Sequence, residues 1–440
     1  MAVPVARPPG PVPGVFNEPS RRHHGWVDRQ PAPRPLVRPE RLLADLEALA
    51  RVGDTGDGGN CRLALTDDDA GGRELVVGWM RDLGLDVRID RIGNVVATRP
   101  GTDPGLDPVM TGSHIDTVRT GGRYDGTLGV LAGLEVVRAL DDAGLHTRRP
   151  LSVAFFTDEE GSRFAPDMLG SLVYVGGMAL EDALGLVGID GAVLGDELAR
   201  IGWAGDAAVP GPVPHAFVEL HIEQGPLLEE QGVTIGAVTG VQGISWHELT
   251  LTGQSNHAGT TPMHLRHDAA YAAAEITTFV RRLAAELGGH QVGTVGRLDL
   301  HPDLVNVVAA RATMTVDLRN TDDAVLAEAE RRLRAHVAEA ADAEGVEAAW
   351  RRLARFAPVA FDPGVVDLVE RTADKLGHSA MRLPSGAGHD AQMLARTCPT
   401  GMVFVPSRGG ISHNPAEHTE PEQLAAGAQV LADVLVDLAS

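Results

Sequence analysis

Leu151-Ser-Val-Ala-Phe-Phe-Thr-Asp-Glu-Glu-Gly161 is the stretch of sequence that decides the fold of this chain. Its first seven residues are mostly apolar, which is typical of a strand that is buried on both faces. Three acidic residues, Asp158, Glu159 and Glu160, and a glycine then form a polar turn. The same order, an apolar run followed by a glycine-rich polar turn, recurs at residues 108–116 and 216–225. We therefore expect buried parallel strands, and α/β proteins gather functional side chains at the carboxyl ends of such strands.

Helix and strand patterns alternate on either side of this stretch. Apolar residues recur at helical spacing in 40–52 and 128–140, and the acidic cluster at 67–69 marks the start of a further helix. The other patterns indicate strands at 85–89, 95–98 and 402–405 and a last helix at 423–438. This alternation predicts an α/β domain with a largely parallel central sheet and helices on both faces.

Residues 239–348 have a different character. Strand and long amphipathic helix patterns follow one another here, at 246–251, 269–287, 312–318 and 324–341. That layout is typical of a small α+β module. We interpret it as a lid or dimerisation domain that is inserted into the catalytic domain.

The catalytic domain is therefore expected to be discontinuous, with residues 38–238 and 349–440 as its two parts. Residues 1–37 are rich in Pro and Arg and show little periodicity, which predicts a flexible tail. An ordered arm that packs on a partner subunit is the alternative for this segment.

The composition limits the partners of this protein. The chain has 440 residues and a formal net charge of −22, which opposes binding to nucleic acid and to anionic membranes. Lys375 is the only lysine, so an anionic substrate would be held by arginine, whose planar fork suits a carboxylate. Cys61 and Cys398 lie far apart and indicate no disulfide framework. Because no membrane span or secretory leader is visible, we expect a cytoplasmic protein.

Five potential metal ligands lie in polar or glycine-rich turns, mostly just after a predicted strand: His114, Asp125, Glu160, His221 and His413. Each has an ordinary alternative, such as a surface turn for a histidine, a helix N-cap for the aspartate or a solvated acidic turn for the glutamate. Together they supply what two divalent cations and one bridging carboxylate need. Oxygen and imidazole ligands without thiolate suit Zn, Mn, Co or Ni. The set therefore favours a metallohydrolase.

Further residues suit the chemistry around such a centre. Neighbours in an extended segment point to opposite faces, so Glu160 can bind a metal while Glu159 transfers a proton. Asp116 follows His114 by two residues and can orient its imidazole ring. These roles are hypotheses that depend on the predicted strands.

The predicted insertion carries residues that suit a substrate. His257 lies in a polar turn, Asn306 precedes the strand pattern at 312–318, and Arg319 follows it. A histidine and an arginine from a second domain would clamp a substrate over the metals. A capped turn and a surface salt bridge are the alternatives.

Eight ordered blocks carry a resemblance to a known family. They are GSHIDTV (112–118), GGRYDGTLGV (121–130), TDEEGSRF (157–164), ELHIEQGP (219–226), HAGTTPM (257–263), DLR (317–319), SGAGHDA (385–391) and GISHNPAE (410–417). This set resembles the amidase, hydantoinase and carbamoylase branch of the M20 metallohydrolases. The branch includes N-carbamoyl-L-amino acid hydrolases, β-ureidopropionases and allantoate amidohydrolases. The resemblance spans roughly residues 52 to 420, with small departures at Ser255 and Asp158.

The resemblance implies two divalent metal ions per subunit, with zinc first and Mn, Co or Ni as alternatives. One ion is expected on His114, Asp125 and His221, and the other on Asp125, Glu160 and His413. Glu159 is implied as the general base, with Asp116 behind His114.

For the substrate, the resemblance implies contacts from Gln224, His257, Asn306, Arg319, Gly388 and His389. His257 would stabilise the oxyanion, and similar enzymes offer it from the lid of the neighbouring subunit. A homodimer with shared lid residues is therefore expected.

The implied reaction is cleavage of the ureido C–N bond of an N-carbamoyl amino acid, of the L-α or the β-alanine type, by a metal-bridging hydroxide. The products would be the amino acid, CO₂ and ammonia. The alternatives are an allantoate amidohydrolase, an M20 aminoacylase or peptidase, and a catalytically silent binding protein on the same fold. His221 argues against a peptidase, because the related peptidases carry a carboxylate at that position.

Overall fold

The computed structural model describes residues 34–440, which form one compact unit. The predicted tail therefore lies outside the described residues, except for 34–37. Those four residues lie against the last helix, α12 (Pro421–Ala439). The Val37 backbone N–H donates to Gln429 Oε1 at 3.1 Å, and Arg34 pairs with Asp433 at 2.9 Å. The chain is thus anchored to α12 before its first helix begins.

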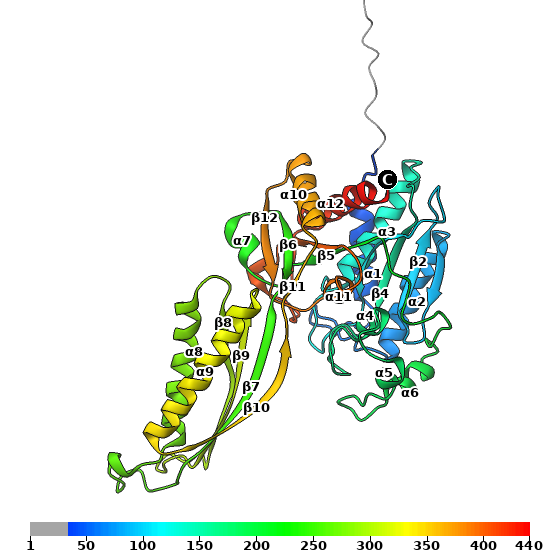
Figure 1. Cartoon of the computed structure of the whole chain (residues 1–440). Coiled ribbons are helices and arrows are strands. Elements are labelled where there is room, and N and C mark those ends of the chain that lie inside the picture. Colours follow the sequence, from blue (N-terminus) through cyan, green and yellow to red (C-terminus); the bar gives the residue numbers. More distant parts are fainter. Residues whose placement is uncertain (1–33) are drawn as a thin grey trace, which may run out of the picture. The chain divides into compact units, whose positions relative to one another are not determined.

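The central sheet has four parallel strands in its middle: β4 (Leu151–Phe156), β3 (Val109–His114), β5 (Ala216–Ile222) and β13 (Thr400–Val405), in that order. Every residue of these strands is buried, so both faces are covered. This confirms the predicted α/β fold with a largely parallel central sheet (Figure 1).

Antiparallel pairs extend this sheet on both sides. β2 (Val95–Arg99) pairs with β4, and β1 (Asp86–Ile89) pairs with β2. Beyond β13, β6 (Ile235–Val241) is antiparallel and carries two further partners. They are β11 (Val359–Ala360) and β12 (Ala380–Ser385), of which the second is parallel to β6.

Helices cover the sheet. The long ones, besides α12, are α1 (Pro39–Ala50), α2 (Asp67–Asp82), α3 (Thr127–Asp142) and α10 (Pro363–Lys375). The short ones are α4 (Leu169–Tyr174), α5 (Leu180–Leu184), α6 (Leu194–Arg200), α7 (Leu227–Gln231) and α11 (Asp390–Leu394). α3 and α12 contact each other and the sheet, as do α4 and α11. The four central strands are therefore covered by helices. Their carboxyl ends lead into the loops that carry most of the predicted ligands.

A second, four-stranded antiparallel sheet lies between β6 and β11 in the sequence. Its order is β10 (Glu347–Phe356), β7 (Gly243–Thr252), β9 (Arg311–Asn320) and β8 (Val292–His301). The helices α8 (Ala269–Leu287) and α9 (Asp323–Glu344) pack on it and form a separate apolar core. Asp268 and Asp322 cap these two helices through their carboxylates. Short turns at Met263–Leu265 (η1) and Arg408–Gly410 (η2) complete the elements.

Strand β10 differs from the sequence-based expectation. It pairs with β7 over residues 347–356, past residue 348, where the predicted insertion ended. β8 and β10 expose most of their residues and show no apolar alternation, so periodicity did not indicate them. Within residues 34–440, no helix is long and apolar enough to cross a membrane.

Candidate active site

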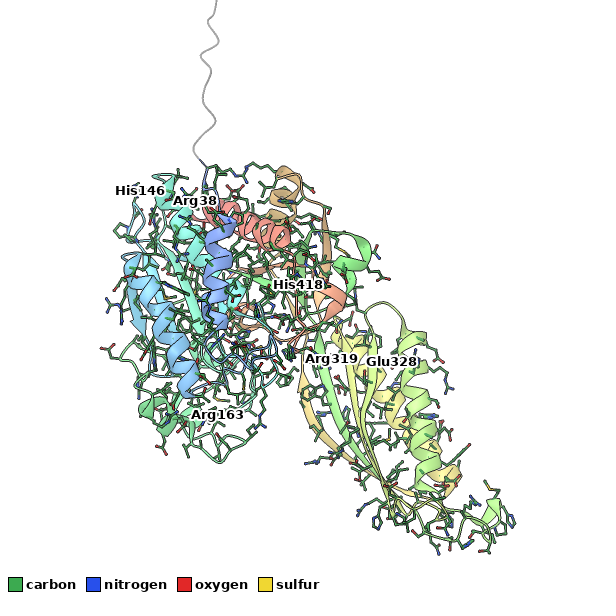
Figure 2. The ribbon with its side chains drawn as sticks, turned by 180° about the vertical axis from the view of Figure 1, so that it is seen from behind. Arg38, His146, Arg163, Arg319, Glu328 and His418 are labelled. Carbon is green, nitrogen blue, oxygen red and sulfur yellow. The ribbon has the colours of Figure 1, made fainter. Side chains whose placement is uncertain are left out.

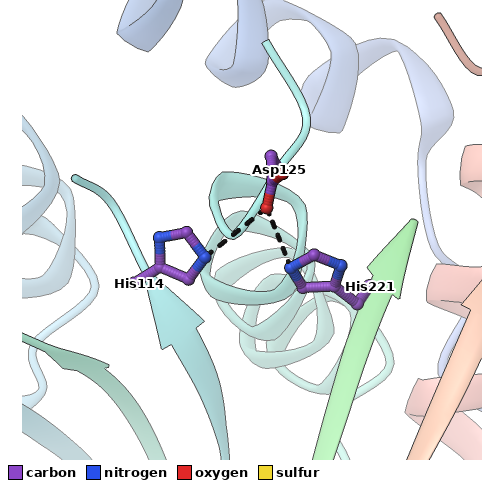
Figure 3. Close-up of side chains that lie close together, drawn as sticks. All are labelled: His114, Asp125 and His221. Carbon is purple, nitrogen blue, oxygen red and sulfur yellow. Dashed lines mark ion pairs between the residues drawn. The ribbon is translucent and has the colours of Figure 1, made fainter. Parts of the chain in front are cut away.

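β3, β5 and the start of α3 bring three predicted ligands together. His114 ends β3, His221 lies in β5, and Asp125 comes two residues before α3. Asp125 Oδ1 lies 3.6 Å from His114 Nε2 and 3.2 Å from His221 Nε2 (Figure 3). Gly126 has a φ of +66°, and a Cβ there would lie 2.3 Å from His114 Nε2. Only glycine therefore allows this close approach of the α3 turn to the imidazole.

The hydrogen bonds of the two histidines fix their tautomers. His114 Nδ1 lies 2.9 Å from the carbonyl oxygen of Asp116, and His221 Nδ1 lies 2.9 Å from that of Ile222. A carbonyl only accepts, so each Nδ1 carries the proton and each Nε2 carries the lone pair, which on His221 accepts the Gly126 N–H at 3.1 Å. Both lone pairs face Asp125. This is the arrangement in which a neutral imidazole binds a metal.

The second predicted ligand group forms on the other oxygen of Asp125. His413 Nε2 lies 3.4 Å from Asp125 Oδ2 and 3.2 Å from Glu160 Oε2. His413 has a left-handed backbone, with a φ of +54°, as do Asp158 and Gln224 in the two neighbouring site loops. Such strained turns are concentrated at functional sites, where the fold holds them in place.

The residues fit two divalent cations. Two groups of three ligand atoms, each within 4.8 Å of one another, share Asp125: His114 with His221, and Glu160 with His413. Among the described residues, the buried Oε1 of Glu160 has no hydrogen-bond partner. Hydrogen bonds to Asp125 and Glu160 raise the pKa of His413 to about 10, so this site already favours positive charge. Bound cations would offset the charge of these buried carboxylates, which otherwise favours their protonation.

Asp116 supports the site in a different way from the expected one. Its carboxylate Oδ1 lies 3.9 Å from His114 Nδ1, whereas its backbone carbonyl lies at 2.9 Å. The carboxylate instead accepts the backbone N–H groups of Glu159 and Glu160, each at 3.3 Å. Asp116 therefore orients His114 through its carbonyl and holds the two-glutamate turn with its side chain. The sequence could not distinguish these contacts, because they depend on the local backbone path.

Glu159 and Glu160 are separated as expected. Glu159 Oε2 lies 3.4 Å from His114 Nε2, on the side of the first ligand group, while Glu160 faces His413. Burial raises the pKa of Glu159 well above its usual range, although His114 opposes this shift. A carboxyl group with a raised pKa that faces a cavity is suited to accept and return a proton.

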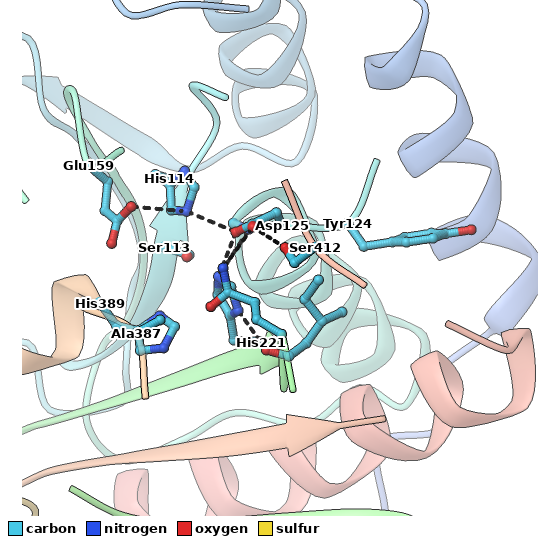
Figure 4. Close-up of polar contacts among 12 residues, drawn as sticks. Ser113, His114, Tyr124, Asp125, Glu159, His221, Ala387, His389 and Ser412 are labelled. Carbon is cyan, nitrogen blue, oxygen red and sulfur yellow. Dashed lines mark hydrogen bonds and ion pairs between the residues drawn. The ribbon is translucent and has the colours of Figure 1, made fainter. Parts of the chain in front are cut away.

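A cavity of about 110 Å³ is lined by all five predicted ligands and by Glu159. Gln224, Gly388 and His389 also line it. The rings of His389 and His221 lie 4.6 Å apart (Figure 4). Gln224 donates its side-chain amide to Asp125 Oδ2 at 2.8 Å, so here it orients the shared carboxylate. His389 is buried and lies 2.8 Å from the Ser385 hydroxyl through its Nε2.

A larger neighbouring cavity, of about 540 Å³, is lined by Arg319. Figure 2 labels this residue. It shares Gln224 and Ala387 with the first cavity. Arg319 is the residue before the last one of β9 and donates from Nη1 to the carbonyl of Gly386 at 2.7 Å. The guanidinium of the second sheet therefore reaches the loop that borders the predicted metal centre.

His257 and Asn306 are not part of this arrangement. They lie beside each other, because the backbone N–H of Ala258 donates to the Asn306 carbonyl at 2.9 Å. Both are exposed. His257 follows the end of β7 and Asn306 precedes the start of β9, whereas Arg319 lies at the other end of β9. Neither residue lines either cavity. The expected clamp of His257, Asn306 and Arg319 is therefore not formed within the described part of one chain.

Two supporting residues were missed by sequence reasoning. Glu417 is buried and accepts the backbone N–H groups of Tyr124 and Asp125, at 2.9 and 3.2 Å. Ser412 donates to either Asp125 Oδ2 or Glu417 Oε2, at 2.9 and 3.0 Å. Both belong to the GISHNPAE block that carried the resemblance, but nothing in their spacing indicated a contact with Asp125.

The family model for peptidase family M20/M25/M40 matches residues 110–437. That range contains every predicted ligand and most of the described chain. The chain belongs to this family.

Individual relatives narrow the branch. The N-carbamoyl-L-amino-acid amidohydrolase of Rhizobium meliloti is 44% identical over 92% of this chain and 97% of its own length. The allantoate amidohydrolase of Bacillus subtilis is 36% identical over 90% of this chain and 96% of its own length. A crystal structure of an amidase of the hydantoinase/carbamoylase family from Burkholderia multivorans has a TM-score of 0.90. It is 46% identical and covers 92% of this chain and 98% of that one. The M20 resemblance and its hydantoinase/carbamoylase branch are thus confirmed.

Proposed function

We propose that this M20 protein hydrolyses the ureido C–N bond of an N-carbamoyl amino acid and releases the amino acid, CO₂ and ammonia. The observation that carries this proposal is the shared carboxylate of Asp125, whose two oxygens face separate ligand groups while Glu159 faces the same cavity. The similarity to N-carbamoyl-L-amino-acid amidohydrolases supports the substrate class.

The residues would divide the work as follows. Two divalent cations on the Asp125 groups would supply Lewis acidity toward the substrate carbonyl and lower the pKa of water. Glu159 would take a proton from the attacking water at Oε2 and return it to the leaving nitrogen. His114 and His221 direct Nε2 toward Asp125. As ligands they would be neutral rings that keep their proton on Nδ1. The carbamate product would lose CO₂ spontaneously. Zinc is the first candidate, with Mn, Co or Ni as alternatives.

Arg319 would bind the substrate carboxylate in the larger cavity. Among the described residues, its guanidinium is the only arginine or lysine side chain that lines either of the two cavities, and it lines the larger one. Asp317 already accepts from Nε and Nη2 of Arg319, and the Gly386 carbonyl accepts from Nη1, so the substrate carboxylate would use the remaining N–H groups of the guanidinium. Whether the amino acid is an L-α-amino acid or β-alanine then depends on the separation of the carboxylate from the carbamoyl group.

His221 favours a ureido substrate over a peptide. A neutral imidazole in place of the carboxylate of the related peptidases leaves the two cations with one more unit of positive charge. The extra charge would further acidify bound water and assist attack on a ureido carbon, which is a weak electrophile.

A second copy of the chain would complete the site. His257 and Asn306 are exposed and sit away from the cavities, so they are free to reach the site of a neighbouring subunit. In this proposal His257 donates to the developing oxyanion and Asn306 to the substrate carboxylate. The homodimer and the cytoplasmic location remain predictions.

Allantoate is the second candidate substrate, and the 36% identity to an allantoate amidohydrolase favours it. Ammonia release from N-carbamoyl-L-methionine, N-carbamoyl-β-alanine and allantoate, together with acetate release from N-acetyl-L-methionine, separates the possibilities. Apoprotein reloaded with Zn, Mn, Co or Ni should act on a carbamoyl amino acid in preference to the others. Preference for allantoate would select the second candidate, and acetate release alone would contradict both.

A further inference from the structure

A buried arginine outside the matched family region lies directly behind the ligand loops. Arg62 is 1% exposed and comes between α1 and α2, whereas the M20 match begins at residue 110. Burial lowers its pKa to about 10, so the side chain is a cation at neutral pH. In the described part of the chain it forms no ion pair with a carboxylate. A buried, unpaired cation is costly, so its position calls for a physical reason.

The acceptors of Arg62 are backbone carbonyls and one amide. Its Nε donates to the Ile115 carbonyl at 2.6 Å. Its Nη1 lies 2.7 Å from the Val52 carbonyl and 2.9 Å from Asn60 Oδ1. The guanidinium therefore joins the end of α1 to the segment that follows β3.

The backbone of Arg62 holds the same segment from its other end. Its N–H donates to the Thr117 hydroxyl at 2.7 Å, and its carbonyl accepts the Thr117 N–H at 3.0 Å. Residues 115 and 117 are thus both fixed by Arg62. Asp116 lies between them.

Asp116 passes this constraint to both ligand loops. Its carbonyl accepts His114 Nδ1 at 2.9 Å, and its carboxylate accepts the N–H groups of Glu159 and Glu160. A shift of the segment would therefore move one histidine ligand and the turn of the two glutamates together.

The fold leaves space for this side chain at one glycine of α2. A Cβ at Gly72 would lie 2.7 Å from Arg62 Cδ and 3.2 Å from its Nε. Glycine in a helix interior is unfavourable relative to alanine, so its presence here is consistent with a packing requirement. At Gly78, in the same helix, a Cβ would meet nothing within 4 Å.

We propose that Arg62 is a positioning residue of the metal centre, which fixes the 115–117 segment so that His114, Glu159 and Glu160 face Asp125. The inference rests on the proposed metal-dependent function but not on the identity of the substrate. It places a determinant of metal affinity in the segment that precedes the matched family region.

The test is the affinity of the full-length apoprotein for Zn²⁺, measured by competition with a chromophoric chelator. Arg62→Met should raise the Zn²⁺ Kd by about ten-fold or more, the effect of losing an outer partner of a ligand. It should also change the visible absorption spectrum of the Co²⁺-loaded protein. Arg99→Met is the matched control, because Arg99 is also buried but contacts Asp141 and Leu145 at the opposite end of the sheet.

A second pair of variants keeps Arg62 itself intact. Gly72→Ala should displace its side chain and weaken Zn²⁺ binding several-fold, whereas Gly78→Ala should leave the Zn²⁺ Kd and the Co²⁺ spectrum unchanged. A Zn²⁺ Kd for Arg62→Met within two-fold of the Kd for Arg99→Met would overturn the inference. If Arg62→Met does not fold, equal Zn²⁺ Kd values for Gly72→Ala and Gly78→Ala would overturn it. Wild-type protein that binds no metal would instead overturn the proposed function.

Discussion

Asp125 is the residue on which the two ligand groups depend. Gln224 and Ser412 hold its Oδ2 side, and the N–H of Asp125 itself is bound by Glu417. These contacts leave Oδ1 facing the two histidines His114 and His221. At this scale the site consists of one carboxylate in a fixed orientation, with every other ligand arranged around it.

Glu159 is proposed as the general base and not as a metal ligand, and its substitution tests that proposal. Glu159→Gln should keep both metals, because Glu160 and Asp125 are untouched, and should lower kcat by roughly 10² to 10⁴-fold. Metal analysis of the purified variant and ammonia release measure the two effects. Wild-type turnover by this variant, or loss of its metals, would refute the assignment.

Asp317 should determine how Arg319 presents its charge. It accepts from Nε and Nη2 of Arg319 at distances of 2.9 to 3.2 Å, while Trp246 lies 5.9 Å from the guanidinium. Asp317→Asn should raise KM by about ten-fold with little change in kcat, because it alters substrate positioning and not proton transfer. A matching loss in kcat with unchanged KM would contradict substrate binding by Arg319. Asp299→Asn, on exposed β8, is the control.

At the scale of elements, the buried strands were the most predictable part of this chain. β4, β3, β5 and β13 are buried throughout, mostly apolar in their first residues and followed by polar turns, so the pattern indicated the strands and the candidate ligands near their ends. β8 and β10 could not be predicted, because they lie in a sheet with an open face and expose most of their residues. Their pairing comes from contacts with β7 and β9, which local periodicity does not reveal.

Strand β7 also carries a histidine that should make stability depend on pH. His247 is buried, its Nε2 lies 2.7 Å from the Ser245 hydroxyl, and its Nδ1 has no hydrogen-bond partner among the described residues. Burial lowers its pKa from 6.5 to about 4. Between pH 6.5 and about pH 4, His247 is therefore protonated in the unfolded chain and neutral in the folded chain. Its contribution is fully present above pH 6.5 and is lost as the pH falls toward 4, by about 3 kcal/mol in all.

Urea unfolding at pH 7.5 and pH 5 measures this effect. The free energy of unfolding of wild type should fall more steeply on acidification than that of His247→Gln, which cannot titrate but can still bond Ser245. Equal decreases in the two proteins would show that His247 does not contribute.

At the scale of the whole molecule, the candidate site could be predicted only in part. The five ligands and Glu159 were predicted because each follows a buried strand or lies in a glycine-rich turn, and parallel strands bring their ends together. The contacts of Asp116, Ser412 and Glu417 could not be predicted, since they depend on the path of the loops. The separation of His257 and Asn306 from Arg319 follows from the length of β9, which the sequence indicated at 312–318, and of β8, which it did not indicate.

Subunit mixing tests whether a second copy completes the site. Glu159→Gln and His257→Ala should each be nearly inactive alone. In a mixed dimer one site would combine an intact Glu159 with an intact His257, so equimolar mixing should restore a substantial fraction of the ammonia release. Mixing two differently tagged samples of Glu159→Gln is the control. No recovery in dimers that demonstrably exchange subunits would contradict the shared site.

The most direct measurement is ammonia release from an N-carbamoyl-L-amino acid during stepwise addition of Zn²⁺, Mn²⁺, Co²⁺ or Ni²⁺ to chelator-stripped protein. The structure predicts no activity without metal and, with the effective ion, activity that rises until two equivalents per chain are bound, since Asp125 serves two ligand groups. Full turnover in the stripped protein, or no ammonia at any loading with any of the four ions, would contradict the central claim.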